Sequence, residues 1–587
     1  MSRFLETFPP IRAEDRQAQG SAQGRHSQLN GVRVLISGRP YWSTTNGPAG
    51  TDEAIAAAVL RAYHTLGPHL FTSARGHFAA AIIDRVEQRV VLGIDRAGVG
   101  SLAYACTPGG QLVFGTSTAE VARHPAVTAG ISRQALFDYL HFHMVPSPAT
   151  VYVGVEKLRP AQYLVFERGK ATVDRYWHPR FEPEPGLKAT NLHEELREIL
   201  HASVARAAGN GQHVGAFLSG GLDSSTVAGM LAEVVPEPVN TFSIGFEAEE
   251  YNELGYARIA AKRFGAHSTE IEVTPANVTE SIPVLAAACD EPFGNSSAIP
   301  AYWCARAARE RGITHLLAGD GGDELFGGNK HYRRQAVFEH YYRLPGAVRS
   351  VLCEGLLLRL IPENAPFPLG KLRSYIDQAR IPLPQRLKSW DFMFRTPAGS
   401  VWDPDFLGSI QAAHPDDVAA GVYHELDSHR TLNHLLYFDW QFVVADNDLR
   451  KVNIACALAG INVSYPMLDA DLVDFSLKLP PEAKLKGPQL RPFYKQALRG
   501  FLPDEILDKE KHGFGLPFGL WLKNDPGLRK MVLESLDALK SRRIIRSDFL
   551  DEVMREHQAG HASYYGYVIY DLVMLEQWLS THGVTTV

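Results

Sequence analysis

Cysteine is scarce in this chain and widely spaced. Five cysteines occur in 587 residues, their number is odd, and no two of them form a CxxC pair. They are Cys106, Cys289, Cys304, Cys353 and Cys456. This pattern disfavours both a disulfide framework and a zinc site. We therefore expect a protein of the reducing cytoplasm.

Long apolar runs and runs of one charge are also missing. No stretch reaches the roughly 18 uninterrupted apolar residues of a membrane span, and residues 1–17 hold no apolar core of a secretion signal. The net charge is −6 and no long run of lysine or arginine occurs. These absences argue against a membrane protein, an exported protein and a nucleic-acid surface, so small or neutral partners are expected.

Short apolar runs alternate with turn residues between about residues 30 and 178. Runs such as "GVRVLISG", "FAAAIID" and "QRVVLGID" predict strands of an α+β domain with a large sheet. Residues 178–191 are rich in proline, glycine and charge, which is typical of a linker. The chain is therefore predicted to have two domains, residues 1–185 and 186–587.

Strands alternate with helices after the linker. The predicted order is strand 213–218, a helix from about 224, strand "VNTFSIGF", helix 252–265, strand "STEIEV", helices 275–288 and 298–311, and strand "THLLAG". Such alternation predicts a parallel sheet with helices on both faces, and ligands bind at the carboxyl ends of its strands. Residues 330–587 are predicted to be mostly helical.

The loop "LSGGLDSS", residues 218–225, carries the clearest chemistry. Its glycines let the backbone turn tightly, and the free N–H groups at the start of the next helix favour an anion. The hydroxyls of Ser219, Ser224 and Ser225 add donors for phosphate oxygens. Phosphate would repel Asp223 unless a divalent cation lay between them, so the loop predicts a pyrophosphate site with Mg²⁺. It is neither a Walker A loop nor a GxGxxG fingerprint.

A second glycine-rich loop, "AGDGGDELFGG", follows the strand "THLL" and carries Asp320, Asp323 and Glu324. If the two loops lie at neighbouring strand ends, Asp223 and Asp323 can share a metal ion. The alternative is a solvated acidic turn.

These loops, with "TFSIGF", "DEPFGNSSAIPAYW", "YPMLDADLVDF" and "KHGFGLPFGLWL", resemble the synthetase domain of the glutamine-dependent asparagine synthetase family over most of residues 190–525. "RGHFAAAIIDRVEQRVVLGIDRAGVGSLAY" resembles the family's N-terminal glutaminase domain. The resemblance implies an N-terminal α+β, Ntn-glutaminase-like sheet domain, followed by an α/β parallel-sheet domain of the PP-loop type with a helical C-terminal part.

The resemblance also implies adenylation. ATP binds, a substrate carboxylate attacks the α-phosphate, pyrophosphate leaves, and an amine captures the acyl-adenylate. Positioning and neutralisation of the pyrophosphate charge would supply most of the catalysis. The residues implied to bind ATP are Ser219, Gly220, Gly221, Leu222, Asp223, Ser224, Ser225, Ser243, Ile244, Gly245 and Gly319, and those implied to bind Mg²⁺ are Asp223 and Asp323.

The N-terminal end departs from that family. Members that hydrolyse glutamine begin with Met-Cys-Gly, and the cysteine becomes the nucleophile. This chain begins Met1-Ser2-Arg3-Phe4, and no cysteine precedes Cys106. We therefore expect a glutaminase-like domain without glutaminase activity, with a structural role beside the synthetase domain.

The synthetase half departs from the family near the substrate. Asn462 and Ser464 stand where relatives have Glu and Arg, and Ile454 stands where they have a basic residue. Lys451, one helical turn earlier, is a candidate replacement for that residue. Arg491 falls at the position of a phosphate-contacting lysine; arginine keeps the positive charge but does not readily shuttle a proton.

Asp320 completes the predicted catalytic set with Lys451 and Arg491. It stands where relatives place an acidic or hydroxylic group near the reacting carboxyl group. It is therefore a candidate to orient the amine or to take its proton, with capping of the turn as the alternative.

These changes cluster at the acyl and amine sites, whereas the ATP loops are kept. Two branches of the family have lost glutamine hydrolysis, the β-lactam synthetases and the lasso-peptide cyclases, and the Tyr–Glu pair of the first is not matched by Asp320 and Asn462. A cyclase would activate an Asp or Glu side chain of a precursor peptide, supplied with a leader-processing partner, and let the peptide's own amine attack.

Two other functions stay open: an ammonia-using, asparagine synthetase-like enzyme and a non-catalytic scaffold. A helical insert or a cleft large enough for a peptide would favour the cyclase. A closed aspartate pocket with a tunnel would favour the ammonia-using enzyme.

Overall fold

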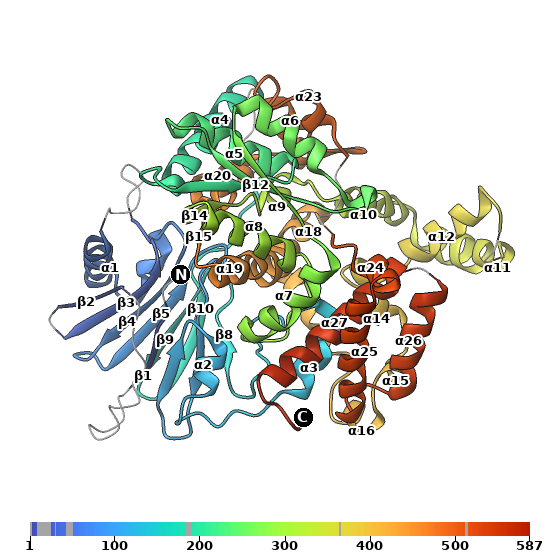
Figure 1. Cartoon of the computed structure of the whole chain (residues 1–587), viewed down its shortest axis with the longest axis horizontal. Helices are drawn as coiled ribbons and strands as arrows, with labels where there is room; N and C mark the ends of the chain where they lie inside the picture. Colours follow the sequence, from blue (N-terminus) through green and yellow to red (C-terminus); the bar gives the residue numbers. More distant parts are fainter. Residues whose placement is uncertain are drawn as a thin grey trace.

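The structure is a computed structural model, and it describes residues 3–8, 25–29, 31–42, 51–182, 189–362, 365–510, 515–560 and 562–587. Met1 and Ser2, the predicted domain boundary at 185/186, and residues 511–514 of the "KHGFG" motif lie outside these ranges. Figure 1 shows strand-rich and helix-rich parts packed side by side. Within the described ranges no helix is long and apolar enough to cross a membrane.

The N-terminal part is an α+β domain with two antiparallel sheets. The six-stranded sheet has the order β10-β9-β5-β4-β3-β2, and the four-stranded sheet has the order β1-β7-β6-β8. The strands are β1 Leu5–Phe8, β2 Arg25–Leu29, β3 Val32–Gly38, β4 Phe78–Asp84, β5 Arg89–Ile94, β6 Ala103–Cys106, β7 Leu112–Gly115, β8 Glu156–Lys157, β9 Gln162–Glu167 and β10 Lys170–Arg175. The valine- and alanine-rich strands β4 and β5 are almost fully buried, because the apolar side chains of the two sheets form one core and those facing α1 (Asp52–Leu66) form another.

Three more helical segments complete this part. They are η2 Gly67–Ser73, α2 Thr118–Ala122 and α3 Arg133–Phe142. Helix α3 leaves the sheets and packs its buried residues into the core of the helix-rich part.

The second part is an α/β domain with a five-stranded, fully parallel sheet, as predicted from the strand–helix alternation. Its order is β13-β12-β11-β14-β15, with β11 Val214–Phe217, β12 Asn240–Gly245, β13 His267–Glu272, β14 His315–Leu317 and β15 Asn462–Ser464. The chain extends the sheet from β11 in one direction to β12 and β13, and in the other to β14 and β15. Because the winding reverses beside β11, the loops after β11 and β14 flank a crevice, which is where ligands bind in open α/β sheets.

Helices connect these strands. They are α4 Ala189–Ala208, α5 Leu222–Val234, η3 Glu249–Tyr251, α6 Leu254–Phe264, α7 Pro275–Ala288, α8 Ala298–Glu310 and α9 Gly322–Phe326. Helix α7 matches its predicted bounds, and α6 and α8 begin and end within two residues of theirs. The helix predicted to start near residue 224 begins two residues earlier, at Leu222.

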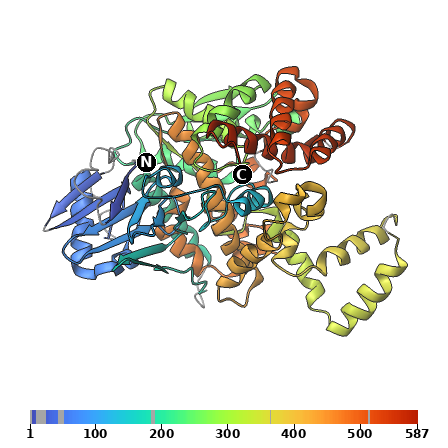
Figure 2. The ribbon, with the colours of Figure 1, turned by 90° about the horizontal axis from the view of Figure 1, so that it is seen from below.

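A helical arm projects from the body of the molecule. Helix α10 (Lys330–Tyr342) leads into η4 (Val348–Leu357), α11 (Leu358–Leu360) and α12 (Leu369–Ala379), which form the yellow extension in Figures 1 and 2. A small core of its own holds the arm together.

The remaining chain is mostly helical, as predicted. It comprises α13 Gln385–Lys388, α14 Phe392–Arg395, α15 Ala398–Val401, α16 Pro404–Leu407, α17 His414–Glu425, α18 Thr431–Asp439, η5 Trp440–Asp448, α19 Leu449–Leu458, η6 Pro466–Leu468, α20 Ala470–Lys478, α21 Pro481–Lys484, β16 Leu485–Lys486, β17 Gln489–Leu490, α22 Pro492–Ala497, α23 Asp504–Asp508, α24 Phe518–Asn524, α25 Pro526–Ser541, α26 Ser547–Ala559 and α27 Ala562–Thr581. Helices η5 and α19 run without a break from Trp440 to Leu458 and lie between the N-terminal domain and the crevice.

Candidate functional site

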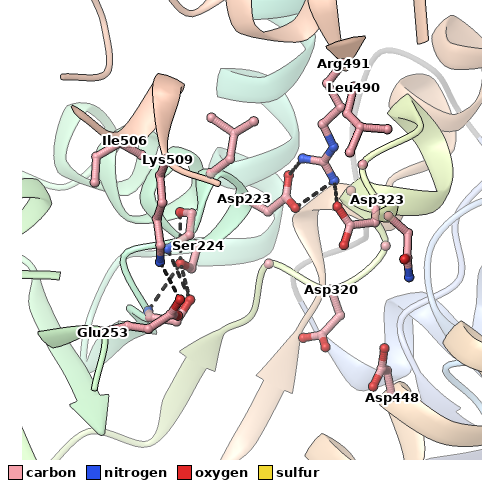
Figure 3. A pocket seen from close by; sticks show the side chains of 18 of the residues that line it. Asp223, Ser224, Glu253, Asp320, Asp323, Asp448, Leu490, Arg491, Ile506 and Lys509 are labelled. Carbon is pink, nitrogen blue, oxygen red and sulfur yellow. Dashed lines mark hydrogen bonds and ion pairs between the residues drawn. The ribbon is translucent and has the colours of Figure 1, made fainter. Parts of the chain in front are cut away.

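A large cavity opens at the carboxyl ends of β11 and β14. Its volume is about 1060 Å³, and both predicted loops line it. Figure 3 shows Asp223 and Asp323 on either side of Arg491, with Asp320 and Asp448 farther along the wall. We name the two ends of the cavity by the roles predicted from the sequence: the nucleotide end lies at the first loop, and the acceptor end lies at Asp320.

The first loop forms the nucleotide end. The Ser219 and Ser224 hydroxyls lie 3.0 Å apart, the Ser219 amide donates to the Ser224 Oγ at 3.2 Å, and the Gly221 amide donates to the Ser219 Oγ at 3.3 Å. Within the described residues no side chain caps the N-terminus of α5, whose N-cap is Gly221. The first amides of this 13-residue helix and its dipole therefore face the cavity, an arrangement that favours phosphate.

Glycines bring the two loops into close contact. A Cβ atom on Gly319 would lie 2.8 Å from the Ser224 backbone nitrogen, and one on Gly322 would lie 2.3 Å from Asp223 Oδ1. Gly220 has φ +70°, and a Cβ there would meet the backbone of α6 at 2.5 Å. Gly319 and Gly220 need to be glycine because the backbone of another element approaches them, whereas a Cβ at Gly322 would displace the Asp223 side chain.

Arg491 joins the two loops electrostatically. Its Nη1 and Nη2 donate to Asp223 Oδ1 and Oδ2 at 2.6 and 2.9 Å, and Nη2 also donates to Asp323 Oδ1. The arginine side chain is 4% exposed. Burial lowers its pKa, but Asp223, together with Tyr494 and Glu324, outweighs that effect and raises the pKa above its usual value. A Cβ on Gly328 would lie 2.0 Å from Arg491 Nε, so this glycine leaves room for the guanidinium. The structure thus brings all three predicted residues together.

The donor chemistry around Asp223 and Asp323 suits Mg²⁺. Two carboxylates and the serine hydroxyls are hard oxygen ligands, and phosphate oxygens would complete such a set. The described residues contain no group of three or more His, Cys, Asp or Glu side chains that is arranged to hold a metal by itself. Arg491 engages both oxygens of Asp223, so a metal ion bound there would require the guanidinium to turn away from that carboxylate.

The "TFSIGF" strand, β12, contributes Phe242 and Ile244 to the cavity wall. Ile244 lines the cavity, whereas Ser243 is buried and donates its hydroxyl to the Leu218 carbonyl at 2.6 Å, which ties β12 to the first loop. Among the described residues, those lining the cavity do not include Gly220, Ser225, Ser243 or Gly245. The predicted contact of these four residues with ATP therefore stays a prediction.

Asp320 and Lys451 meet at the acceptor end. The Lys451 Nζ lies 3.7 Å from Asp320 Oδ1 and 2.8 Å from Asp448 Oδ1. Burial raises the pKa of Asp320 to about 6; Lys451 lowers that pKa, and Asp448 raises it. The pKa of Lys451 is raised, because Asp448 and Asp320 outweigh the effect of burial. The two predicted residues therefore form an ion pair in the cavity wall.

Asn462, Ser464 and Ile454, the positions that differ from the family that the sequence resembles, are not among the described residues that line the cavity. Ser464 accepts or donates a hydrogen bond with His315 at 2.9 Å, Asn462 is exposed, and Ile454 packs against the core. Lys451 lines the cavity, whereas Ile454 does not appear on its described wall.

Sequence reasoning missed several residues of the cavity wall. Lys509 pairs with Glu253 at 2.8 Å near the first loop, and Lys330 and Arg333 at the start of α10 line the opposite side. Asn295 donates to Asn447 at 2.6 Å at the acceptor end. Two of these residues could have been found from the sequence, because Lys509 lies just before the motif "KHGFG" and Asn295 lies within "DEPFGNSS". Lys330 and Arg333 belong to no such motif.

Cys106 does not lie near this site. The residue is exposed at the end of β6, but its sulfur is partly buried. This burial, and the nearby charge of Glu156, raise the pKa of the Cys106 thiol. The other four cysteines are buried. Burial also raises the pKa of Cys289, Cys304 and Cys456, so neither these three nor Cys106 is placed as a low-pKa nucleophile.

Known proteins resemble the chain over most of its length. Residues 195–580 match the family described as asparagine synthase, and residues 51–177 match the one described as glutamine amidotransferase domain. Asparagine synthetase (glutamine-hydrolyzing) 1 of Bacillus subtilis (strain 168) is 25% identical over 90% of this chain and 80% of that protein. A putative asparagine synthetase (glutamine-hydrolyzing) of Mycobacterium bovis is 26% identical over 82% and 73%.

A solved structure, that of the allosteric regulatory enzyme of purine biosynthesis, aligns with 42% of this chain and 61% of its own length, at 10% identity and a TM-score of 0.18. A likeness at this level adds nothing about the site.

Proposed function

Because the chain belongs to the asparagine synthase family and is an ATP-dependent, AMP-forming carbon–nitrogen ligase, we propose that it closes a ring in a precursor peptide. In this proposal an Asp or Glu side chain of the peptide is adenylated, and the peptide's own N-terminal amine attacks the acyl-adenylate. The bond formed is an amide, and AMP leaves. A leader-processing partner would supply the peptide.

The size of the cavity is the observation that carries this proposal. At about 1060 Å³ it lies at the upper limit of pockets that hold small molecules, which range over roughly 300–1,000 Å³. A site for ATP and free aspartate needs less room. The helical arm adds support, because α10, which leads into it, presents Lys330 and Arg333 to the cavity.

The nucleotide end would hold the ATP phosphates. The first amides of α5 are donors fixed in place before the nucleotide binds, so little reorganisation of these groups accompanies pyrophosphate departure. The Ser224 hydroxyl donates to the Gly221 carbonyl at 3.2 Å, and it and the Ser219 hydroxyl would turn to donate to the phosphates. The Arg491 guanidinium would neutralise charge that develops on pyrophosphate, and its Nε is buried without a hydrogen-bond partner in the described chain. Bound Mg²⁺, held by Asp223 and Asp323, would supply further neutralisation of the phosphate charge.

The acceptor end would handle the amine. An attacking amine must lose a proton, and a carboxylate with a pKa near 6 can take it at neutral pH. Lys451 would hold Asp320 in its ionised form and orient it, since the two groups form an ion pair. Asp320 is thus proposed as the base and Lys451 as its partner.

The N-terminal domain is proposed to lack glutaminase activity. The support comes from the cysteines: four are buried, and Cys106 has a raised pKa, whereas a nucleophilic cysteine needs a lowered one. Glutamate release from glutamine by the purified chain would contradict this proposal, and Cys106→Ala is the matched variant to identify the thiol responsible.

A second candidate is amidation of aspartate or another small carboxylate with ammonia. The two relatives are named asparagine synthetases, which favours the amidation of aspartate. Their names specify glutamine hydrolysis, so the use of ammonia depends on the proposed lack of glutaminase activity. A non-catalytic scaffold is disfavoured because both ATP loops are intact and converge on one cavity.

One experiment separates the three. Pyrophosphate release from ATP and Mg²⁺ is measured with aspartate plus ammonia, with aspartate plus glutamine, and with peptides that carry an Asp or Glu at varied distances from a free amine. Release with a peptide alone, and a product lighter by one water, supports cyclisation. Release with aspartate and ammonia supports the second candidate, and no release with any substrate supports the scaffold.

A further inference from the structure

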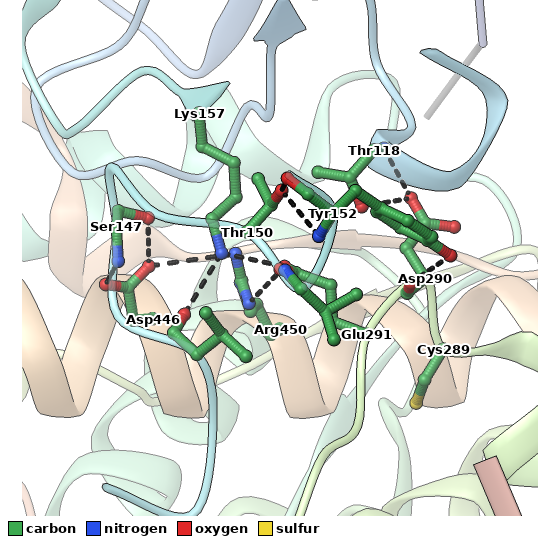
Figure 4. A network of polar contacts seen from close by, with 12 residues as sticks. Thr118, Ser147, Thr150, Tyr152, Lys157, Cys289, Asp290, Glu291, Asp446 and Arg450 are labelled. Atoms are coloured by element: carbon green, nitrogen blue, oxygen red, sulfur yellow. Dashed lines mark hydrogen bonds and ion pairs between the residues drawn. The ribbon is translucent and has the colours of Figure 1, made fainter. Parts of the chain in front are cut away.

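A buried network of charges joins the N-terminal domain to the synthetase domain (Figure 4). Lys157, at the end of β8, donates to Glu291 Oε2 at 2.7 Å and to the Val145 carbonyl at 3.0 Å. Arg450 of α19 donates to the same Glu291 oxygen at 3.2 Å. Glu291 belongs to the loop after α7, so three distant segments meet at one carboxylate.

Positive and negative charges balance in the network, and its centre is buried. The Lys157 and Glu291 side chains are 3% and 5% exposed. The remaining Glu291 oxygen accepts from the Val151 amide at 2.9 Å, and Asp446 accepts from the amide and hydroxyl of Ser147 at 2.8 and 2.6 Å. Arg450, whose side chain is 23% exposed, also lies 3.8 Å from Asp446, so two cations face two buried carboxylates. Removing one charge alone leaves the network with an unbalanced charge: without Lys157, Glu291 and Asp446 share the cation of Arg450. Such an imbalance is unfavourable among buried groups.

Both synthetase segments that Lys157 secures continue into the cavity. The loop of Glu291 runs on to Asn295 and Ser297, which line the acceptor end. The helix of Arg450 presents Asp448 and Lys451 to the same end. The Asn295–Asn447 hydrogen bond at 2.6 Å links these two segments to each other.

The two faces of the helix explain how the network acts on the cavity. Asp446 and Arg450 lie one turn apart on the face toward the N-terminal domain, and Asp448 and Lys451 lie on the face toward the cavity. Side chains end about 5–6 Å from a helix axis, so rotating this helix by about 20° would move the end of Lys451 by about 2 Å. A displacement of about 1 Å at a reacting group can cost about 100-fold in rate.

We infer that Lys157 is a positioning residue for the acceptor end of the cavity. It acts through Glu291 and Arg450, which hold the loop of Asn295 and the helix of Lys451 in register with Asp320. The inference rests on the proposed roles of Asp320 and Lys451, and it assigns the N-terminal domain a part in amide formation. The nucleotide end does not touch the network, so adenylation should be much less sensitive to it.

The test compares Lys157→Met with the conservative Lys157→Arg and with Arg75→Met. Arg75 makes a different contact between the domains, with Asp471 at 2.5 Å, and touches neither the Glu291 loop nor the Lys451 helix. The double variant Lys157→Met/Glu291→Leu removes one cation and one carboxylate together and leaves Arg450 paired with Asp446. It should therefore fold even if Lys157→Met does not.

Two readouts are taken on the full chain. The first is the kcat and KM of product formation beside the rate of ATP–pyrophosphate exchange. The second is amide hydrogen exchange of peptides covering residues 289–297 and 440–452. Lys157→Met and the double variant should lower the kcat of amide formation about 10- to 100-fold, leave the KM for ATP and the exchange rate within about threefold, and speed hydrogen exchange in both peptides. Lys157→Arg should restore most of the loss, and Arg75→Met should leave both readouts near wild type.

The outcomes are distinct. A folded double variant with wild-type turnover and wild-type hydrogen exchange overturns the inference, as does an equal loss with Arg75→Met. If wild type itself forms no product, the proposed function fails, whereas hydrogen exchange still decides whether Lys157 orders the two segments.

Discussion

The two ends of the cavity are built in different ways. The nucleotide end consists mainly of two loops in which residues close in sequence, Ser219 to Ser224 and Gly321 to Asp323, present backbone amides and short side chains. The acceptor end consists of side chains from three segments: Asn295 from the loop after α7, Asp320 from the loop after β14, and Asp448 and Lys451 from one continuous helix. The first end depends on local sequence, and the second depends on how distant segments pack.

This difference predicts which step of the reaction a substitution at each end should affect. A change at the nucleotide end should remove both adenylation and amide formation, because every product requires the adenylate. A change at the acceptor end should reduce amide formation while adenylation persists. The following predictions test that division, from the largest effect to the smallest.

Asp223→Ala is expected to lower pyrophosphate release by about 1,000-fold, or about 4 kcal/mol of barrier. The variant removes a predicted Mg²⁺ ligand and leaves the buried Arg491 with only Asp323. Pyrophosphate release is measured under saturating ATP, with Asp537→Ala, in an exposed ion pair far from the cavity, as the control. A loss of less than tenfold would show that the carboxylate has no part in phosphate binding.

Lys451→Met is expected to lower amide formation about 100-fold and to change ATP–pyrophosphate exchange by no more than about threefold. Asp320 then lacks the cation that orients it. The two rates are measured on the same preparation, with Lys451→Arg as the variant that keeps the charge. Equal losses in both rates would contradict the division between the two ends.

The pH profile of amide formation should show an acid limb near pH 6. Burial raises the pKa of Asp320 to about 6, so its carboxylate accepts a proton as the pH falls through that value and no longer acts as a base. The kcat for amide formation should fall about tenfold per pH unit below the limb, and Asp320→Asn should remove the limb and lower the plateau. The same limb in the Asp320→Asn variant would assign it to another group.

Arg491→Lys is expected to have the smallest effect, about a tenfold loss of pyrophosphate release. Lysine keeps the positive charge but loses the bidentate contact with Asp223 and the bridge to Asp323. Pyrophosphate release is measured beside Arg491→Met, which should lose far more. Equal rates for the two variants would show that charge at this position does not matter.

The sequence predicted much of this architecture. Helix α7 begins and ends where its pattern of apolar residues placed it, and the parallel sheet follows from the alternation of strands with helices. The loop after β11 was recognised because its glycines, serines and aspartate are consecutive, so its chemistry is visible in one short string. The closeness of Asp223 and Asp323 was also predictable, because adjacent parallel strands bring the loops that follow them together.

Other features were beyond sequence reasoning. Arg491 lies 268 residues from Asp223 along the chain, and only the folded cavity places its guanidinium between the two carboxylates. The Lys157–Glu291–Arg450 network combines three segments that share no motif, so nothing in the amino-acid sequence indicated that these residues make contact. Residues 330–587 were predicted only to be mostly helical, and neither the individual helices α11 and α12 nor their path away from the body was predicted.

The amino-acid sequence by itself determined the order of strands and helices and the chemistry of the two loops, because periodicity, glycine placement and helix N-termini are local properties. Only the tertiary structure decided the size of the cavity, the place of Arg491 and the contact through which the N-terminal domain reaches Lys451. These depend on side chains far apart in sequence becoming buried together, and a buried charge is stable only where its partner has been brought to it.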